Sequence, residues 1–315
     1  MLALIGRRLL ATVPLLFLVS LIVFALVHAL PGDPAVLFLG EEATPENLAR
    51  FRARLGFDRP LVAQYGEWLG RAVRGDLGRS LRTNQPVSEA IRERLPVTLE
   101  LLGAALAVSL TIAIPMGIVS AVKRNSGIDL FSTFFALVGF SMPGFWLGII
   151  LIWVFALFLR WLPPSGFVPL LASVPENVRS LILPAITLGT ALAALVARQL
   201  RSGMLEVLRQ DYVRTAQAKG LSGRQVIGKH ALKNALISVV TVVGLQLGGL
   251  LGNTIITETL FALPGVGRLM IDSIFSRDFF VVQGVILFLA VGYVVANLLV
   301  DILYSFLDPR IRVRS

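Results

Sequence analysis

Residues 98–122 read TLELLGAALAVSLTIAIPMGIVSAV, and this stretch decides the class of fold. Its single charged residue, Glu100, lies near one end. A helix of roughly 20 apolar residues crosses the hydrocarbon layer of a bilayer, so the stretch predicts a membrane-spanning helix. The 315-residue chain is 56% hydrophobic and only 15% charged, whereas soluble domains carry about 25% charged residues. Together with the absence of cysteine, this composition excludes a soluble enzyme, a disordered chain, a disulfide scaffold and a thiolate metal site.

Five further stretches on either side of residues 98–122 have the same character. The predicted spans are Leu9–Leu30, Thr98–Val122, Ile128–Leu159, Leu181–Leu200, Ala235–Leu260 and Val281–Leu307. The first is longer than the core of a secretory signal, about 7–15 residues, so we expect a retained anchor. The third is interrupted by Ser141-Met142-Pro143-Gly144, which predicts either a kink in one helix or a break into two.

The distribution of basic residues predicts the orientation of the spans. With six spans, residues 1–8, 123–127, 201–233 and 308–315 fall on one side and hold 14 Lys and Arg against three acidic residues. The short opposite loops hold four Arg, and all four lysines lie on the first side. The positive-inside rule places that side, with both termini, in the cytoplasm. This parity favours a single crossing for the third stretch, and it attributes the net charge of +10 to topology and anionic headgroups, not to nucleic acid.

The sequence predicts three regions. They are residues 1–30 with the first span, a polar external segment 31–97, and a five-helix core 98–315 that includes the loop 201–233. Charged and apolar residues interleave at helical spacing in the external segment, for example in Pro45–Arg54, so we expect an ordered subdomain. Two roles stay open for it: a cap on the bundle, which we favour, or a docking surface for a soluble partner.

No motif in the sequence predicts catalysis. Residues 223–230, GRQVIGKH, nearly fit a phosphate-binding loop, but His230 occupies the position of the magnesium-binding hydroxyl and no apolar strand precedes it. His28 and His230 are predicted on opposite sides of the membrane and cannot share a metal ion. Carboxylates are missing from the centres of the spans, so a coupling-ion relay is not expected and the energy for transport should come from elsewhere.

A glycine row occupies one face of the fifth span at Gly244, Gly248 and Gly252. Small residues at this spacing let helices approach closely, so packing within the bundle is the favoured interpretation. Lining of a narrow path is the alternative.

The loop Arg201–Lys233 carries the strongest functional signal. We expect two short helices, the first ending near Lys219 with Gly220 as its left-handed terminator, the second capped by Ser222. Val226, Ile227, His230 and Ala231 would share one face of the second helix, opposite the basic residues Arg224, Lys229 and Lys233. Such a compact helical protrusion suits a groove on a partner protein. An interfacial helix lying on headgroups is a nearly equal alternative.

At these residues the sequence resembles a known family. DYVRTAQAKGL at 211–221, followed by HALKNAL at 230–236, resembles the EAA loop of ATP-binding-cassette importer permeases, and more narrowly the B-type permease of the dipeptide/oligopeptide/nickel group. The resemblance extends over essentially the whole chain. It includes LPGDP at 30–34, RGDLGRS at 74–80, LPVTLE at 95–100, SMPGFWLG at 141–148, PGVGR at 264–268 and LDPR at 307–310.

The resemblance implies an all-α integral membrane protein, a six-helix type I importer permease with an external helical insertion after its first helix. It implies a subunit without catalysis or cofactor of its own, in a bacterial or archaeal cytoplasmic membrane. ATP and magnesium would bind two cytoplasmic ATPase partners, a second permease would complete the path, and an external binding protein would deliver the substrate. Dipeptides or oligopeptides are the favoured cargo, because no His, Cys or carboxylate cluster suggests passage of a metal.

The resemblance also implies which residues contact the ATPases. Ala216 and Gly220 match the alanine and glycine of the family motif, whereas Arg214 and Thr215 replace its Glu-Ala pair. The full predicted coupling loop comprises Arg214, Thr215, Ala216, Lys219, Gly220, Leu221, Ser222, Arg224, Val226, Ile227 and His230. The competing function is a secondary transporter or channel that works alone and is indifferent to ATP.

Overall fold

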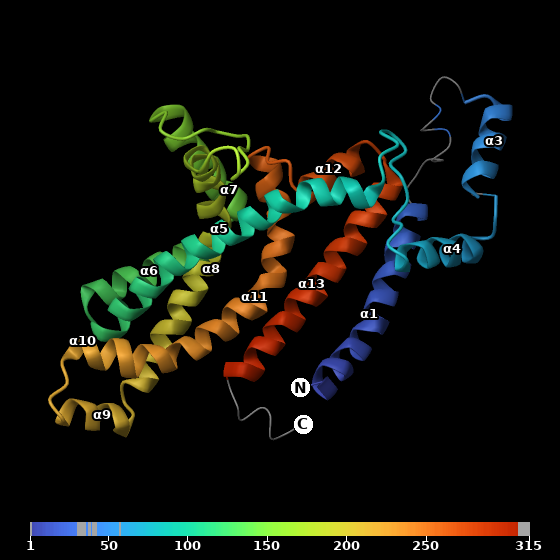
Figure 1. The fold of residues 1–315 in the computed structure, drawn as a ribbon. Coiled ribbons are helices and arrows are strands. Elements are labelled where there is room, and N and C mark those ends of the chain that lie inside the picture. The colour runs from blue at the N-terminus through green and yellow to red at the C-terminus, as the bar shows by residue number, and fades with distance from the viewer. Residues whose placement is uncertain (1, 30–35, 37–38, 40–42, 57, 308–315) are drawn as a thin grey trace. The chain divides into compact units, whose positions relative to one another are not determined.

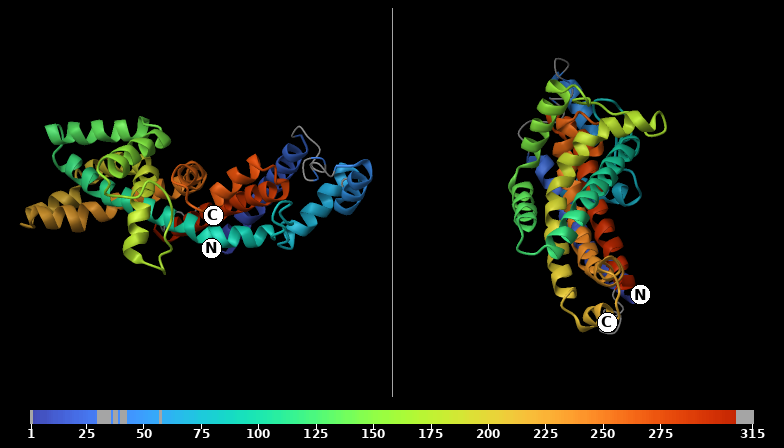
Figure 2. Two further views of the ribbon diagram at one scale, coloured as in Figure 1. Left: turned by 90° about the horizontal axis from the view of Figure 1, so that it is seen from above. Right: turned by 90° about the vertical axis from the view of Figure 1, so that its left-hand side faces the viewer.

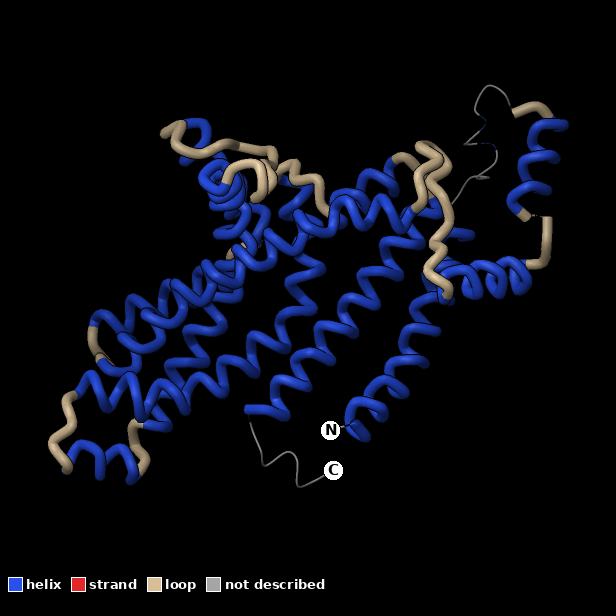
Figure 3. Tube along the Cα trace, in the orientation of Figure 1, coloured by secondary structure: helices blue, strands red, loops and turns tan. Residues whose placement is uncertain are grey.

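The computed structural model describes residues 2–29, 36, 39, 43–56 and 58–307. These residues form helices joined by loops, with one isolated bridge between Arg79 and Pro86 (Figure 3), and the further views in Figure 2 contain helices and loops alone. The all-α prediction is confirmed. The chain divides into two compact units, Met1–Val97 with Pro264–Val295, and Thr98–Leu263 with Ala296–Ser315. The segments LPGDP and LDPR lie wholly or mostly outside the described residues.

The first unit contains the N-terminal helix and the short helices of the polar segment. Its elements are α1 (Leu2–Ala29), α3 (Pro45–Leu55), α4 (Leu61–Val73), the start of α5 (Val87–Val122), α12 (Val266–Phe275) and most of α13 (Phe279–Leu307) (Figure 1). Thr44 caps α3 and Gly56 ends it in the left-handed conformation, which confirms the expected helix at Pro45–Arg54. Tyr65 of α4 hydrogen-bonds Ser20 of α1 at 2.8 Å.

A buried apolar cluster joins α5, α12 and α13 within the first unit. Val87, Val266 and Val285 are fully buried in it. The adjoining loop is held by Asp278, which accepts hydrogen bonds from the Ser80 hydroxyl and, at 3.2 Å, from the Leu81 backbone amide. Residues 80 and 81 are thus held against chain that follows almost 200 positions later, and the division into an external subdomain stays a prediction.

The second unit is built around two long helices, α8 (Val174–Val207) and α11 (Lys233–Leu260). The rest of α5 packs with them, together with α6 (Gly127–Ser141), α7 (Gly144–Leu151) and the π-helix η2 (Ile152–Phe158). Glycines allow close approach: at Gly189 an added Cβ would lie 2.5 Å from the Ala105 carbonyl oxygen. At Gly244 it would lie 2.2 Å from Cγ1 of Val300.

The glycine row of the fifth span has two environments. Gly244 and Gly248 are buried, and the approach of Val300 at Gly244 supports the packing interpretation. Gly252 is exposed and has nothing within 4 Å of a built Cβ. Only the first part of the row therefore serves packing within the unit.

The third predicted span, Ile128–Leu159, is not one helix. The chain bends by 104° between α6 and the helix pair Gly144–Phe158. Pro143 lacks a backbone N–H and forces Met142 into an extended conformation, with ψ at 126°, so α6 cannot continue past it. The two halves still connect opposite ends of the unit. Asp129 of α6 contacts Arg201 near the end of α8, whereas Gly166, after η2, contacts Phe261 after α11.

The described residues contain four helices that are long and apolar enough to cross a membrane, Val87–Val122, Val174–Val207, Gly223–Leu260 and Phe279–Val300. The bent pair makes a fifth if counted as one span, and Thr12–Leu26 is a shorter apolar helix in α1. The total of six spans stays a prediction.

Candidate functional site

The predicted coupling loop is more helical than the sequence analysis expected. Helix α8 continues through Arg201 to Val207, and the second expected helix is the beginning of a continuous helical run, α10 (Gly223–Gln225), π-helix η3 (Val226–Leu232) and α11. The expected loop Arg201–Lys233 therefore has non-helical chain only on either side of α9 (Asp211–Ala218), which Figure 3 shows as two short loops. The polar residues that follow the predicted end of the fourth span do not end the helix. They continue it, and some of them are exposed.

The end of the first short helix and the start of the second were predicted correctly. Helix α9 ends at Ala218 with Lys219 as its C-cap residue, and Gly220 follows in the left-handed conformation at φ +78°, which an L-residue adopts only with strain. Ser222 begins the next helix, and its backbone amide donates to Oε1 of Gln225 at 3.1 Å. We call residues 208–232 the hairpin.

The hairpin has a buried apolar cluster of its own. Val213 and Ala216 of α9 pack with Val226 of η3, and Val207 and Leu208 cover them. The prediction that Val226, Ile227, His230 and Ala231 share one face agrees with their burial. Val226 and Ala231 are buried, and Ile227 and His230 are partly buried. This face packs against the protein itself and does not form an exposed apolar edge.

A polar contact adds to the attachment of α9. The side-chain amide of Asn234, in the first turn of α11, donates to the Tyr212 hydroxyl at 2.7 Å and to the His230 carbonyl oxygen at 3.1 Å. Helix α9 is therefore linked through packing to the end of α8 and through both packing and hydrogen bonding to the start of α11. A displacement of α9 would be transmitted to both long helices.

The exposed side of the hairpin combines basic, polar and apolar residues. Seven of the predicted coupling residues are exposed: Arg214, Thr215, Lys219, Gly220, Leu221, Ser222 and Arg224. Arg214 lies 3.8 Å from Asp211, with both side chains largely in solvent, so this ion pair contributes little stability. The remaining predicted residues, Ala216, Val226, Ile227 and His230, are buried or partly buried and act on this surface only through the packing beneath it.

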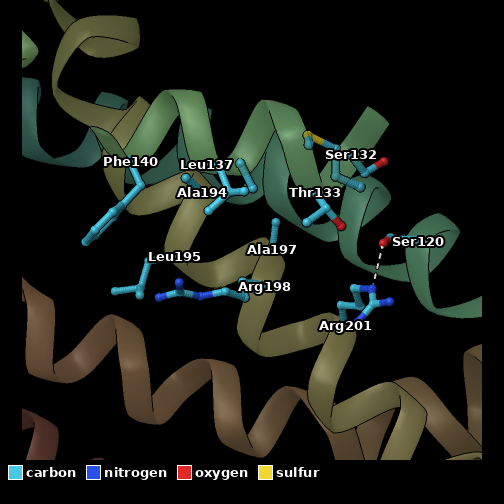
Figure 4. A pocket seen from close by; sticks show the side chains of 12 residues that line it. Ser120, Ser132, Thr133, Leu137, Phe140, Ala194, Leu195, Ala197, Arg198 and Arg201 are labelled. Carbon is cyan, nitrogen blue, oxygen red and sulfur yellow. Dashed lines mark hydrogen bonds between the residues drawn. The ribbon is translucent and has the colours of Figure 1, made fainter. Parts of the chain in front are cut away.

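An ion pair between a partly buried arginine and a buried aspartate lies beyond the hairpin, where α5, α6 and α8 meet. Arg201 donates to both carboxylate oxygens of Asp129, from Nε at 2.8 Å and from Nη2 at 2.7 Å. The Ser120 hydroxyl also donates to Asp129, and the backbone N–H of Asn125 donates to Oδ2 of Asp129 at 2.9 Å. Figure 4 shows the contact between Ser120 and Arg201. A two-pronged guanidinium–carboxylate contact fixes the mutual orientation of helices as well as their distance.

In the predicted topology Asp129 falls at the start of the third span and Arg201 at the start of the loop 201–233, and no pairing between them was predicted. A usable signal was present, because the charge distribution put residues 123–127 and 201–233 on one side. An acidic and a basic residue that flank apolar stretches on the same side are candidates for an ion pair. The contact agrees with that shared side.

Other carboxylates hold the opposite end of the second unit. The fully buried Glu258 of α11 accepts a hydrogen bond from the Thr98 hydroxyl at 2.7 Å. Glu100 accepts one from the amide of Asn177 at 2.7 Å, and that amide also donates to the Val168 carbonyl oxygen. Among the described residues no group of three or more His, Cys, Asp or Glu could hold a metal ion.

The near match to a phosphate-binding loop has a different structure. Residues 223–230 lie within α10 and η3, and the element before them is helix α9. A phosphate-binding loop would instead connect a strand to a helix.

Comparisons with known proteins show which family and which relatives this chain resembles. Residues 113–313 match the family of binding-protein-dependent transport system inner membrane components, and residues 1–102 match the N-terminal region of such membrane components. A putative peptide transport system permease protein of Brucella abortus is 47% identical over 99% of both chains. A dipeptide transport system permease of Alkalihalophilus pseudofirmus is 46% identical over 99% of this chain and all of the relative.

A glutathione transport system permease of Escherichia coli is 43% identical over 97% of both chains. Among solved structures, the MetNI methionine ABC transporter in inward-facing conformations aligns with a TM-score of 0.57 at 17% identity, over 69% of this chain and 96% of that one. An amino acid ABC transporter with histidines aligns with a TM-score of 0.50 at 16% identity, over 71% and 94%. At these identities the likeness concerns the fold alone.

Proposed function

The chain belongs to the family of binding-protein-dependent transport system inner membrane components, and from this premise we propose that it forms half of the translocation path of an ATP-driven importer of dipeptides or oligopeptides. As a multi-pass inner-membrane protein, it would position the path while other subunits hydrolyse ATP. The observation that carries the proposal is the match along the whole chain to permeases of peptide transport systems.

The cargo is inferred from what the relatives share. The named relatives transport peptides, dipeptides or glutathione, which are all amide-linked compounds with free carboxylates. The absence of a metal-binding group among the described residues gives no reason to prefer a metal ion. A peptide is therefore the cargo that the relatives favour.

The partners follow from the family and from the design of this chain. We infer a second permease of similar fold, two ATPase subunits in the cytoplasm, and an external protein that binds the peptide and delivers it. Neither the sequence nor the described site offers phosphate chemistry within this subunit. Conformational work would therefore enter through contacts with the ATPases.

The hairpin is the element best suited to those contacts. Its exposed surface carries Arg214, Lys219 and Arg224. Its buried cluster attaches α9 to the end of α8 and to η3, and a hydrogen bond from Asn234 attaches α9 to α11. Closure of the ATPases would move the hairpin as a rigid body and shift the bundle between inward-facing and outward-facing states. Such a shift requires that nucleotide binding favour one state over the other.

Reconstitution of the complex tests this function directly. The permease, its expected partner permease and the two ATPases are assembled in vesicles, and labelled dipeptide uptake is measured with the binding protein and ATP. We expect uptake only when all subunits and ATP are present. Uptake by this chain alone, driven by a gradient and indifferent to ATP, would establish the competing secondary transporter instead.

A charge reversal separates coupling from assembly. Arg224→Glu changes an exposed residue of the hairpin and leaves its buried cluster intact, so the subunit should insert and fold normally. We expect ATP hydrolysis to continue while peptide uptake falls at least about tenfold, a loss near 1.4 kcal/mol in coupling. Wild-type uptake by this variant, with wild-type uptake also by Gly220→Pro, would contradict a coupling role for the hairpin.

A further inference from the structure

A cavity of about 190 Å³ lies between α5, α6 and α8 of the second unit. Its lining comprises Met116, Ser120, Ser132, Thr133, Ala136, Leu137, Phe140, Ala194, Leu195, Ala197, Arg198 and Arg201. The walls are mostly apolar, and the lining contains two arginines and no carboxylate. Figure 4 shows how these side chains lie around the cavity. An apolar cavity with a small number of convergent polar groups is the usual form of a ligand site.

The two arginines differ in their partners. Arg201 is neutralised by Asp129, which it contacts through both carboxylate oxygens. Arg198 lies one turn earlier on α8, and its guanidinium carbon is 5.6 Å from the centroid of the Phe140 ring. Among the residues that the structure describes, no carboxylate lies within 4.0 Å of Arg198. The cavity therefore carries one uncompensated positive charge.

The direction of the Arg198 side chain argues against a lipid headgroup as its ligand. Basic side chains at the ends of spans ordinarily extend toward the headgroups. Arg198 extends the other way, away from Arg201 and past Leu195 toward Phe140 (Figure 4). Its charge is thus directed away from the end of α8 that carries Arg201, on a side of the helix that is exposed in this chain. Ionisable residues within membrane-spanning helices are rare and ordinarily face a cavity or a path in place of lipid.

We propose that Arg198 and Phe140 form a transient site for the C-terminal carboxylate of a peptide in transit. This inference rests on the proposed function and names the substrate group that the path recognises. A guanidinium binds a carboxylate through charge-assisted hydrogen bonds, and every unmodified peptide carries that carboxylate whatever its side chains. The site therefore accepts many sequences. Ser132 and Thr133 on α6 also line the cavity, nearer to Ser120 than to the Arg198 guanidinium (Figure 4).

The geometry also limits the strength of the site. A transport path must bind its cargo well enough to admit it and weakly enough to release it. The Phe140 ring occupies one face of the Arg198 guanidinium and leaves its edge for the carboxylate. One cation in a mostly apolar lining suits such passage better than a closed binding pocket would.

Single-cysteine labelling tests the site, because the natural chain contains no cysteine. Leu137→Cys places one thiol in the cavity wall. In the assembled complex, we compare its rates of reaction with an anionic and a cationic water-soluble methanethiosulfonate. The positive charge of Arg198 should favour the anionic reagent by about tenfold, as a single nearby charge does in a partly desolvated site.

Three control variants isolate the role of Arg198. Arg198→Met in the Leu137→Cys background should abolish the preference for the anionic reagent, whereas Arg198→Lys should keep most of it. Leu130→Cys lies on the same helix, exposed but outside the cavity, and should show no preference that depends on Arg198. A preference that survives Arg198→Met would overturn the proposal. Reaction of Leu137→Cys only with a lipid-soluble maleimide would overturn it too, and would assign the cavity to lipid.

Protection by peptide identifies the carboxylate. A free dipeptide should slow the labelling of Leu137→Cys, and the same dipeptide with an amidated C-terminus should not, because it lacks the negative charge. Equal protection by both compounds, or by neither, would contradict the inference. ATP-driven uptake by the wild-type complex is measured in the same vesicles. If that uptake is absent, the proposed function fails; if it is present and the labelling results are negative, only the carboxylate site fails.

Discussion

The two ends of the second unit are fastened in different ways. At the hairpin end, a guanidinium–carboxylate pair joins α6 to α8, and a buried apolar cluster attaches the protruding helix α9. At the opposite end, buried and partly buried carboxylates accept hydrogen bonds from neutral donors, Thr98 to Glu258 and Asn177 to Glu100. A two-pronged guanidinium–carboxylate contact adds charge attraction and a fixed mutual orientation to its hydrogen bonds. We therefore expect the ion pair to hold α6 and α8 together at the hairpin end more firmly than contacts with neutral donors hold the opposite end.

The largest effect is expected at the hairpin end. Asp129→Ala leaves the partly buried guanidinium of Arg201 without its partner, and loss of one member of a buried pair costs about 3–5 kcal/mol. The midpoint of thermal unfolding in detergent should fall steeply, with less folded protein recovered. The double variant Asp129→Leu with Arg201→Met should regain much of that loss. A single variant as stable as the natural protein would remove the basis of the comparison.

A smaller effect is expected at the opposite end. Thr98→Val deletes the hydroxyl that donates to the fully buried Glu258, and loss of a donor to a buried acceptor costs about 1–3 kcal/mol. Thermal unfolding should shift less than in Asp129→Ala. The matched change Thr111→Val, at an exposed position of the same helix α5, provides the control. Equal losses for Thr98→Val and Asp129→Ala would mean that the two ends are fastened alike.

Within the hairpin, backbone conformation alone gives the smallest change. Gly220 has φ at +78° and nothing within 4 Å of a built Cβ, so Gly220→Ala meets no steric clash with its neighbours. The left-handed conformation should still cost about 1–2 kcal/mol. Protection of the α9 amides from hydrogen exchange should fall, with little change in the amides of α8. Unchanged protection throughout α9 would show that the turn does not depend on glycine.

The sequence was sufficient to predict the helical ends that local chemistry determines. Gly220 and Ser222 terminate and begin helices because of a backbone conformation and a capping side chain, and both signals are local. The lengths of α8 and of the helix from Gly223 were missed. Polarity marks where a helix leaves the apolar layer, not where it ends, so residues after Leu200 can stay helical while exposed.

Long-range contacts were the part that the sequence could not supply. The positive charge of Arg201 and the negative charge of Asp129 are 72 positions apart, and only the charge distribution hinted at their shared side. The bend at Pro143 was expected as a kink or a break, but its angle of 104° depends on how α7 packs against α8. The uncompensated charge of Arg198 likewise became visible only when α5, α6 and α8 were placed together.

The central claim is that partner ATPases act on this subunit through the exposed face of the hairpin. Cross-linking in the assembled transporter tests it most directly, with single cysteines at Thr215 on α9 and, as the matched control, at the exposed Leu171 in the loop before α8. The account predicts that Thr215→Cys forms a cross-linked product containing an ATPase subunit and that Leu171→Cys does not. A product from Leu171→Cys, with none from Thr215→Cys, would contradict it.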